Sequence, residues 1–241
     1  MDTPEVTKLL SAAKQLGKEA GKLTFSLPVA VVYNTLDYAW EGHALYLKKY
    51  GAPRKKVIFL GMNPGPWGMV QTGVPFGEVD AVQHWLGIEA PIGKPRIEHP
   101  KRPVTGFNCK RSEVSGKRLW GLFRERFGTA DAFFNDYFVA NYCPLAFMET
   151  EGRNRTPDKL TPAEALPLFA LCDRHLAQTV AILEPEWLIG VGRFTEMSAR
   201  RALQGTPVKI GHILHPSPLN PTANRRWAET VTTQLEALGI W

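Results

Sequence analysis

Two stiff segments of the chain carry polar side chains that could do chemistry. In residues 61–69, glycines and prolines surround Asn63 and fix an irregular backbone, which leaves amide N–H groups to face a ligand. The same composition is typical of an ordinary turn. The segment matches neither the phosphate-binding P-loop nor the glycine-rich dinucleotide fingerprint. Its composition alone therefore leaves two interpretations open, a ligand-binding loop and a structural turn.

The second segment, residues 215–221, begins with His215. Its three prolines stiffen the chain and expose Leu219 between them, just before a helix that carries Arg225. Proteins that distort DNA insert apolar side chains of this kind between base steps, and enzymes that act on a base must extrude it from the stack. The segment thus has the build of a rigid wedge. A proline-rich turn with a hydrogen-bonded histidine is the plainer alternative.

A third feature is a basic stretch at residues 94–118. It holds eight basic residues against Glu98 and Glu113, within a formal net charge of +6 for the whole chain. Its prolines and Gly106 indicate a long loop that runs into a helix. Such a loop either contacts phosphates or is a solvated surface. The basic residues are Lys94, Arg96, Lys101, Arg102, Lys110, Arg111, Lys117 and Arg118.

The elements that must position these residues alternate along the chain. Short apolar runs predict strands at residues 56–60, 137–140, 187–191 and 208–214. Helical spacing predicts helices at residues 5–22, 78–86, 112–127, 162–183, 194–203 and 222–238. This order indicates an α/β fold, a three-layer α/β/α sandwich with a central, mainly parallel four-stranded sheet. We expect a single domain over residues 1–241.

The unusual residues fall at the carboxyl ends of the expected strands. Asn63, Asn141, Gly192 and His215 each follow one of the four apolar runs. Ligands of open parallel sheets bind beyond those ends. Four loops can therefore converge on one pocket.

Length and composition narrow the class of protein. The 241 residues are 44% hydrophobic, which suits one compact core. No apolar run approaches the roughly 20 residues that cross a bilayer. The first residues also lack the basic segment followed by an apolar segment that is typical of a signal peptide. We therefore expect a soluble, intracellular protein without membrane contact. Cys109, Cys143 and Cys172 are too far apart for a disulfide framework or a four-cysteine metal site. We expect no metal and no cofactor.

Three stretches together resemble one known family. Residues 61–78, 141–145 and 215–224 are similar, in sequence and spacing, to the SMUG-type, single-strand-selective monofunctional uracil-DNA glycosylases of the uracil-DNA glycosylase superfamily. The resemblance implies a glycosylase that flips a base and hydrolyses the glycosidic bond of uracil in single- and double-stranded DNA, which initiates base excision repair. It also implies activity on 5-substituted uracils such as 5-hydroxymethyluracil.

The resemblance also assigns roles inside the pocket. Asn63 would hold the attacking water, and His215 would stabilise negative charge on the departing uracil. Phe76 would stack on the flipped base and Asn141 would read its Watson–Crick edge, because uracil and cytosine present opposite donors and acceptors there. Backbone amides near Met62 would add hydrogen bonds. The wall near C5 of the base would be formed by Gly65 and Met69.

Outside the pocket, the resemblance makes the wedge segment and the basic stretch the expected contacts with DNA. Animal members of the family carry arginine at the place of Leu219, so duplex opening is where this chain should differ. No lysine lies within the matched motifs, and we expect no lyase activity. We expect a monomer, located in the cytoplasm or nucleoid of a bacterium or in a eukaryotic nucleus. The expected DNA contacts are Pro216, Ser217, Pro218, Leu219, Asn220, Arg225, Lys110, Arg111 and Lys117.

Two alternatives remain at this point. The first is a glycosylase of the same superfamily with hypoxanthine or xanthine as its main substrate, because the same loops host several specificities. The second is a non-catalytic DNA-binding protein that uses the basic stretch. The presence of both Asn63 and His215 favours an enzyme over the second alternative.

Overall fold

A computed structural model describes residues 2–52 and 54–241, and a four-stranded parallel sheet lies at its centre. Its strand order is β3-β2-β6-β7. Every residue of β2 is buried, as expected for an apolar strand covered on both faces. The strands predicted from the sequence are confirmed, and the sheet is wholly parallel. They are β2 (Val57–Gly61), β3 (Tyr137–Asn141), β6 (Trp187–Val191) and β7 (Lys209–Ile213).

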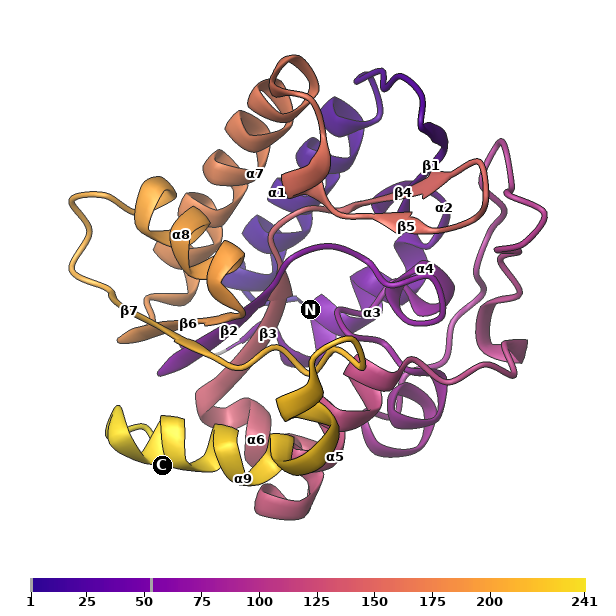
Figure 1. The fold of residues 1–241 in the computed structure, drawn as a ribbon. Coiled ribbons are helices and arrows are strands. Elements are labelled where there is room, and N and C mark those ends of the chain that lie inside the picture. The colour runs from indigo at the N-terminus through magenta and orange to yellow at the C-terminus, as the bar shows by residue number, and fades with distance from the viewer. Residues whose placement is uncertain (1, 53) are drawn as a thin grey trace.

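Helices cover both faces of this sheet, which confirms the three-layer prediction (Figure 1). On one face lie α1 (Pro4–Ala20), α7 (Pro162–Leu183) and α8 (Arg193–Ala202). On the other lie α5 (Val114–Phe127), α6 (Ala130–Asp136) and α9 (Pro221–Ala237), the last with a break in its helical backbone at Arg226. None of the helices among the described residues is both long and apolar enough to span a bilayer.

A second, antiparallel sheet was not predicted. It consists of β1 (Val29–Asn34), β4 (Leu145–Glu149) and β5 (Asn154–Arg155), in the order β1-β4-β5. The pair most distant in sequence is Val29 and Glu149, so the strands meet only after about half of the chain has folded back. This sheet lies beside the loop that follows β2 (Figure 1).

Several short elements also differ from the sequence-based expectation. The helix expected at residues 78–86 is a π-helical turn, Ala81–Trp85. The helices α2 (Thr35–Tyr38), α3 (Trp40–Tyr50) and α4 (Met69–Thr72) were not expected. Residues 94–113 form the expected long loop, with a short 3₁₀ turn at Gly106–Asn108.

An aromatic core fixes α5 against the sheet and so supports the loops above it. The rings of Phe123 and Phe133 stack with centroids 4.4 Å apart, and Trp120 meets Phe133 edge to face. The indole N–H of Trp120 donates to the backbone carbonyl of Phe76 at 3.0 Å. The core therefore reaches directly to one of the predicted base-binding residues.

Candidate active site

A cavity of about 330 Å³ lies at the carboxyl ends of the central strands. All seven residues predicted to do chemistry or to bind the base line it, together with Ser217 from the wedge segment. Three of the four segments expected to converge, the loops after β2 and β7 and the end of β3, thus line one cavity, whereas Gly192 after β6 is not among the lining residues. The predicted residues in this lining are Met62, Asn63, Gly65, Met69, Phe76, Asn141, His215 and Ser217.

The unpredicted sheet fixes the orientation of the Asn63 side chain. The amide nitrogen Nδ2 of Asn63 donates to the backbone carbonyl of Leu145, the first residue of β4, at 3.2 Å. The amide nitrogen is therefore engaged by the protein. The carbonyl oxygen Oδ1, which only accepts hydrogen bonds, is left to hold a water molecule.

His215 is a neutral imidazole with a defined tautomer. Burial lowers the pKa of His215 to about 4, so the ring is uncharged at neutral pH. The backbone N–H of Ser217 donates to Nδ1 of His215 at 3.1 Å, which makes Nδ1 an acceptor without a proton. The proton therefore resides on Nε2, and His215 can offer one hydrogen bond to a ligand. Gly192, at a φ of 100°, makes the turn after β6 beneath this ring.

Phe76 is held in an uncommon backbone conformation. Its φ of 51° is rare for a residue with a side chain, and such conformations persist only where surrounding contacts enforce them. Its ring lies 6.5 Å from that of His215, at an interplanar angle of 42°. A Cβ on Gly61 would come within 2.5 Å of the Phe76 ring and 2.3 Å of Oδ1 of Asn141. Glycine at 61 is therefore what lets the ring and the amide approach each other.

The amide of Asn141 also has a defined direction. Its Nδ2 donates to the sulfur of Met69 at 3.2 Å. Because a thioether sulfur only accepts, the NH₂ group faces Met69 and Oδ1 faces Gly61. Asn141 thus presents a donor on its Met69 side and an acceptor on its Phe76 side.

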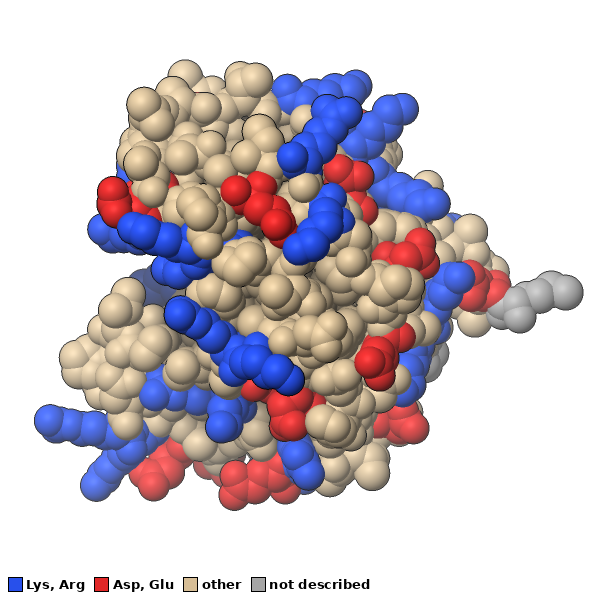
Figure 2. All heavy atoms as spheres, turned by 90° about the vertical axis from the view of Figure 1, so that its right-hand side faces the viewer, with Lys and Arg blue, Asp and Glu red and all other residues tan. Residues whose placement is uncertain are grey.

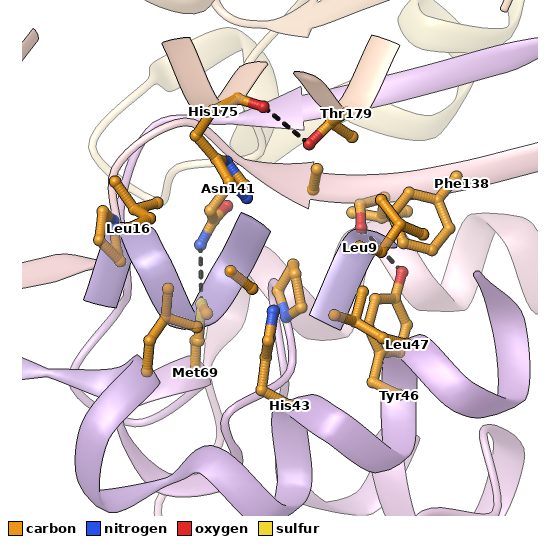
Figure 3. Close-up of a pocket in the computed structure, with 16 residues that line it drawn as sticks. Leu9, Leu16, His43, Tyr46, Leu47, Met69, Phe138, Asn141, His175 and Thr179 are labelled. Atoms are coloured by element: carbon orange, nitrogen blue, oxygen red, sulfur yellow. Dashed lines mark hydrogen bonds between the residues drawn. The ribbon is translucent and has the colours of Figure 1, made fainter. Parts of the chain in front are cut away.

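A smaller cavity of about 40 Å³ lies behind Asn141 (Figure 3). In this view the amide lies between His175 and Met69, and His43 points into the same space. Nδ1 of His43 hydrogen-bonds the carbonyl of Gly73 at 2.9 Å. Burial lowers the pKa of His43 and of His175 to about 4. The neighbouring His43 also contributes, to a smaller extent, to the lowered pKa of His175. The two imidazoles beside the amide are therefore uncharged at neutral pH, and neither places a positive charge next to it.

Five residues of the base cavity were not predicted, and Glu113 is the most unusual of them. Burial raises the pKa of the Glu113 carboxyl, and its buried Oε2 has no hydrogen-bond partner among the described residues. A Cβ on Gly65 would lie 2.3 Å from this oxygen. The available signal was an acidic residue directly before a helix, in a stretch that holds only one other acidic residue. The five residues are Pro66, Glu113, Ser115, Asn154 and Thr156.

The wedge segment is exposed and is held at both ends. The side chain of Leu219 is 92% exposed. The guanidinium of Arg118, on α5, donates to the carbonyl of Pro216 at 3.0 Å and to the side chain of Asn224 at 2.9 Å. The amide of Asn224 in turn donates to the carbonyl of Pro218 at 2.8 Å. One side chain therefore ties both ends of the wedge to the helix beneath it, a role that the sequence did not reveal.

The remaining predicted DNA contacts lie outside the base cavity, and all of them except Pro216 reach the surface. Pro216 is buried, and Pro218 is exposed beside Leu219. Asn220 is half-buried, and its backbone N–H donates to the carbonyl of Ser217. Lys110, Arg111, Lys117 and Arg225 are exposed.

The described residues contain no group of three His, Cys, Asp or Glu side chains arranged to hold a metal ion. The three cysteines are free thiols, with Cys143 and Cys172 buried and Cys109 half-buried. In the base cavity, the amides of Asn63 and Asn141 and the imidazole of His215 present directed, uncharged hydrogen-bonding groups, beside the buried carboxyl of Glu113.

Comparisons with known proteins agree on one family. The model of the uracil DNA glycosylase superfamily matches residues 48–236. The single-strand selective monofunctional uracil DNA glycosylase of Mus musculus is 48% identical over 94% of this chain and 82% of its own length. The corresponding proteins of Rattus norvegicus and Bos taurus are 49% and 46% identical over the same share of this chain. The crystal structure of Pedobacter heparinus SMUG2 shares the fold, with a TM-score of 0.67 at 17% identity over 96% of this chain and 97% of that one.

Proposed function

From the premise that this chain belongs to the uracil DNA glycosylase superfamily, we propose that it flips a uracil nucleotide into the base cavity. Asn63 and His215 then carry out the hydrolysis of the glycosidic bond. The chain is a monofunctional uracil-DNA glycosylase, and its substrate is DNA. The observation that carries the residue assignment is the shared cavity. Asn63, His215, Phe76 and Asn141 come from distant parts of the chain and line one space.

The chemistry divides between the two polar residues of the strand-end loops. When the bond between C1′ and N1 breaks, its electron pair stays with the uracil and the sugar becomes cationic. Nε2–H of His215 donates to the oxygen on which the negative charge develops, and this stabilises the leaving group without a proton transfer. Oδ1 of Asn63 holds a water, whose oxygen bonds to C1′. The proton lost by that water goes to solvent or to the uracil anion.

Recognition of uracil rests on the direction of the Asn141 amide. Its NH₂ group would donate to O4 of the base, and its Oδ1 would accept from N3–H. Cytosine presents an amino group at C4 and an unprotonated N3, so both contacts would become unfavourable. Because C5 adjoins C4, the 5-position lies on the Met69 side. We therefore assign 5-substituents to the wall near Gly65 and Met69, and include 5-hydroxymethyluracil among the substrates.

Contacts with duplex DNA would come from the exposed wedge and the basic surface. Leu219 would fill the space left by the flipped base. The cations Lys110, Arg111, Lys117 and Arg225 would contact phosphates. We further propose that the enzyme is a single-domain, intracellular monomer that initiates base excision repair and uses no cofactor.

A base-release panel tests this proposal. Purified protein is incubated with uracil, 5-hydroxymethyluracil, hypoxanthine and xanthine in matched single strands and duplexes, and abasic sites are revealed by alkali. We expect release of the two uracils, and strand scission only after alkali. Dominant release of hypoxanthine or xanthine would favour the other specificity. No release of any base, with DNA binding retained, would indicate a binding protein.

A further inference from the structure

A groove of about 580 Å³ lies beside the base cavity and has no role in the chemistry above. Trp67 and the loop of residues 100–111 form its walls. This loop is on the right in Figure 1, and Figure 2, which views the molecule from that side, shows Lys and Arg side chains spread over that face. The basic residues that line the groove are Lys101, Arg102, Lys110 and Arg111.

Two arginines of this groove are held by one indole. The guanidinium carbons of Arg102 and Arg111 lie 5.1 Å and 4.6 Å from the ring centre of Trp67. Cation–π contacts at these distances restrict the side chains and leave the edges of the guanidinium groups available for hydrogen bonds. The two cations are therefore ordered before any ligand arrives.

Neither arginine is neutralised by a carboxylate. Among the described residues, Lys101 pairs with Glu151 at 2.8 Å, but no ion pair includes Arg102 or Arg111. One terminal nitrogen of Arg102 donates to the carbonyl of Lys101 at 2.9 Å, and its buried Nε has no partner among those residues. Two ordered positive charges thus line the groove, and no ion pair among the described residues neutralises them. An anion with several oxygens would satisfy them.

The groove is continuous with the base cavity along the chain. Gly65 and Pro66 line the cavity, and the next residue, Trp67, lines the groove. A DNA strand that delivers a nucleotide into the cavity from this side would pass close to Trp67. The anion that reaches this groove is then the backbone phosphate of a flanking nucleotide.

We propose that Arg102 and Arg111, stacked on Trp67, form a clamp for the phosphates next to the target nucleotide on the strand that carries it. The inference rests on the proposed function, since it takes the flipped nucleotide to occupy the base cavity. The clamp contacts the backbone only, so it strengthens binding to any sequence. It also acts on a single strand, because it needs no partner strand.

The test is binding of a uracil-free single-stranded oligonucleotide by fluorescence anisotropy at several salt concentrations. The double variant R102Q/R111Q removes both charges and keeps side-chain length. We expect its Kd to rise about tenfold, and the slope of log K against log salt to flatten by about 1.4, at about 0.7 per phosphate contact on a single strand. Trp67→Phe should keep most of the affinity and Trp67→Ala should lose part of it, because the ring orders the arginines.

Arg126 supplies a matched control. It is exposed and also stacks on an indole, with its guanidinium carbon 4.3 Å from the ring centre of Trp241, and the two line a different surface groove. Arg126→Gln removes one stacked charge, against two in R102Q/R111Q, and should change Kd less than twofold, compared with about threefold for each of Arg102→Gln and Arg111→Gln alone. An unchanged Kd for R102Q/R111Q, or an equal rise for Arg126→Gln, would overturn the clamp.

A second measurement places the clamp on the strand. Uracil-containing single strands are shortened one nucleotide at a time from either end, and KM is compared for the wild type and R102Q/R111Q. We expect the difference to vanish when shortening from one end and to persist from the other, with kcat unchanged. If the KM difference between the wild type and R102Q/R111Q persists when the strand is shortened from either end, the clamp is contradicted. If the wild type releases no uracil, the proposed function fails, while the anisotropy still decides whether the groove binds DNA.

Discussion

The base cavity and the wedge segment are built on opposite principles. In the cavity, Asn63, Asn141 and His215 are uncharged at neutral pH, partly buried and directed by hydrogen bonds from strand ends and neighbouring loops. In the wedge, Leu219 is almost fully exposed and is presented by a proline-stiffened loop tied to one helix. Directed groups in a sheltered space can act on a bound uracil whether a single strand or a duplex delivers it. An exposed apolar side chain can act only where a duplex must be opened.

The fold thus separates hydrolysis of the base, in the cavity, from the opening of duplex DNA, at the wedge. Changes in the cavity should affect single strands and duplexes alike, because both deliver the same flipped base. Changes at Leu219, the exposed tip of the wedge, should affect duplexes alone, because a single strand has no stacked partner to replace. The following experiments test that division.

The largest expected effect comes from the catalytic pair. Asn63→Ala removes the amide that holds the water, and His215→Ala removes the donor to the leaving group. Each should lower single-turnover excision by about 100-fold or more, equally on both substrates. Rates under enzyme excess measure the chemical step, and anisotropy with product-like DNA checks that binding persists. A loss of excision confined to duplexes would contradict the assignment of the chemistry to the cavity.

The wedge should show the next largest effect. Leu219→Ala removes the side chain that fills the gap, and we expect duplex excision to fall about tenfold while single-strand excision changes less than twofold. The ratio of the two rates is the measurement. An equal loss of excision on duplexes and single strands would show that Leu219 does not act as a wedge.

A smaller effect of the same kind is expected at Arg118. Arg118→Met keeps the aliphatic stem but breaks the hydrogen bonds to Pro216 and Asn224, so the wedge loses its anchor to α5. Duplex excision should fall about fivefold, since these bonds order the loop without touching the base. Arg118→Lys, which keeps the charge but not the fork, should recover part of the loss. Equal effects of Arg118→Met on both substrates would show that it supports His215 rather than the wedge.

The smallest effect is expected from pH. Because burial lowers the pKa of His215 to about 4, the ring stays neutral from pH 8 down to pH 5, and single-turnover rates should be nearly flat over that range. As pH falls through about 4, the ring gains a proton on Nδ1, which the Ser217 N–H opposes, and the rate should drop. Wild-type rates on a single strand at each pH provide the profile. A step near pH 6.5 would mean that His215 titrates as a solvated histidine.

Much of the molecule was predictable from local patterns. The four central strands are short apolar runs with clear boundaries, and α7 spans the predicted residues because Thr161 and Glu164 form a capping box at its start. The second sheet was not predictable in this way. Val29 and Glu149 pair across about half of the chain, and β5 has two residues, too few to carry a pattern.

The sequence by itself determined which residues could do the chemistry and where they lie along the fold, because residue type, glycine and proline content and strand ends are local properties. Only the tertiary structure decided the direction of each group. Leu145 turns the amide of Asn63, Met69 turns that of Asn141, and the Ser217 N–H selects the tautomer of His215. A hydrogen bond needs its partner at about 3 Å, and that distance exists for Leu145 and Met69 only after distant segments have packed together.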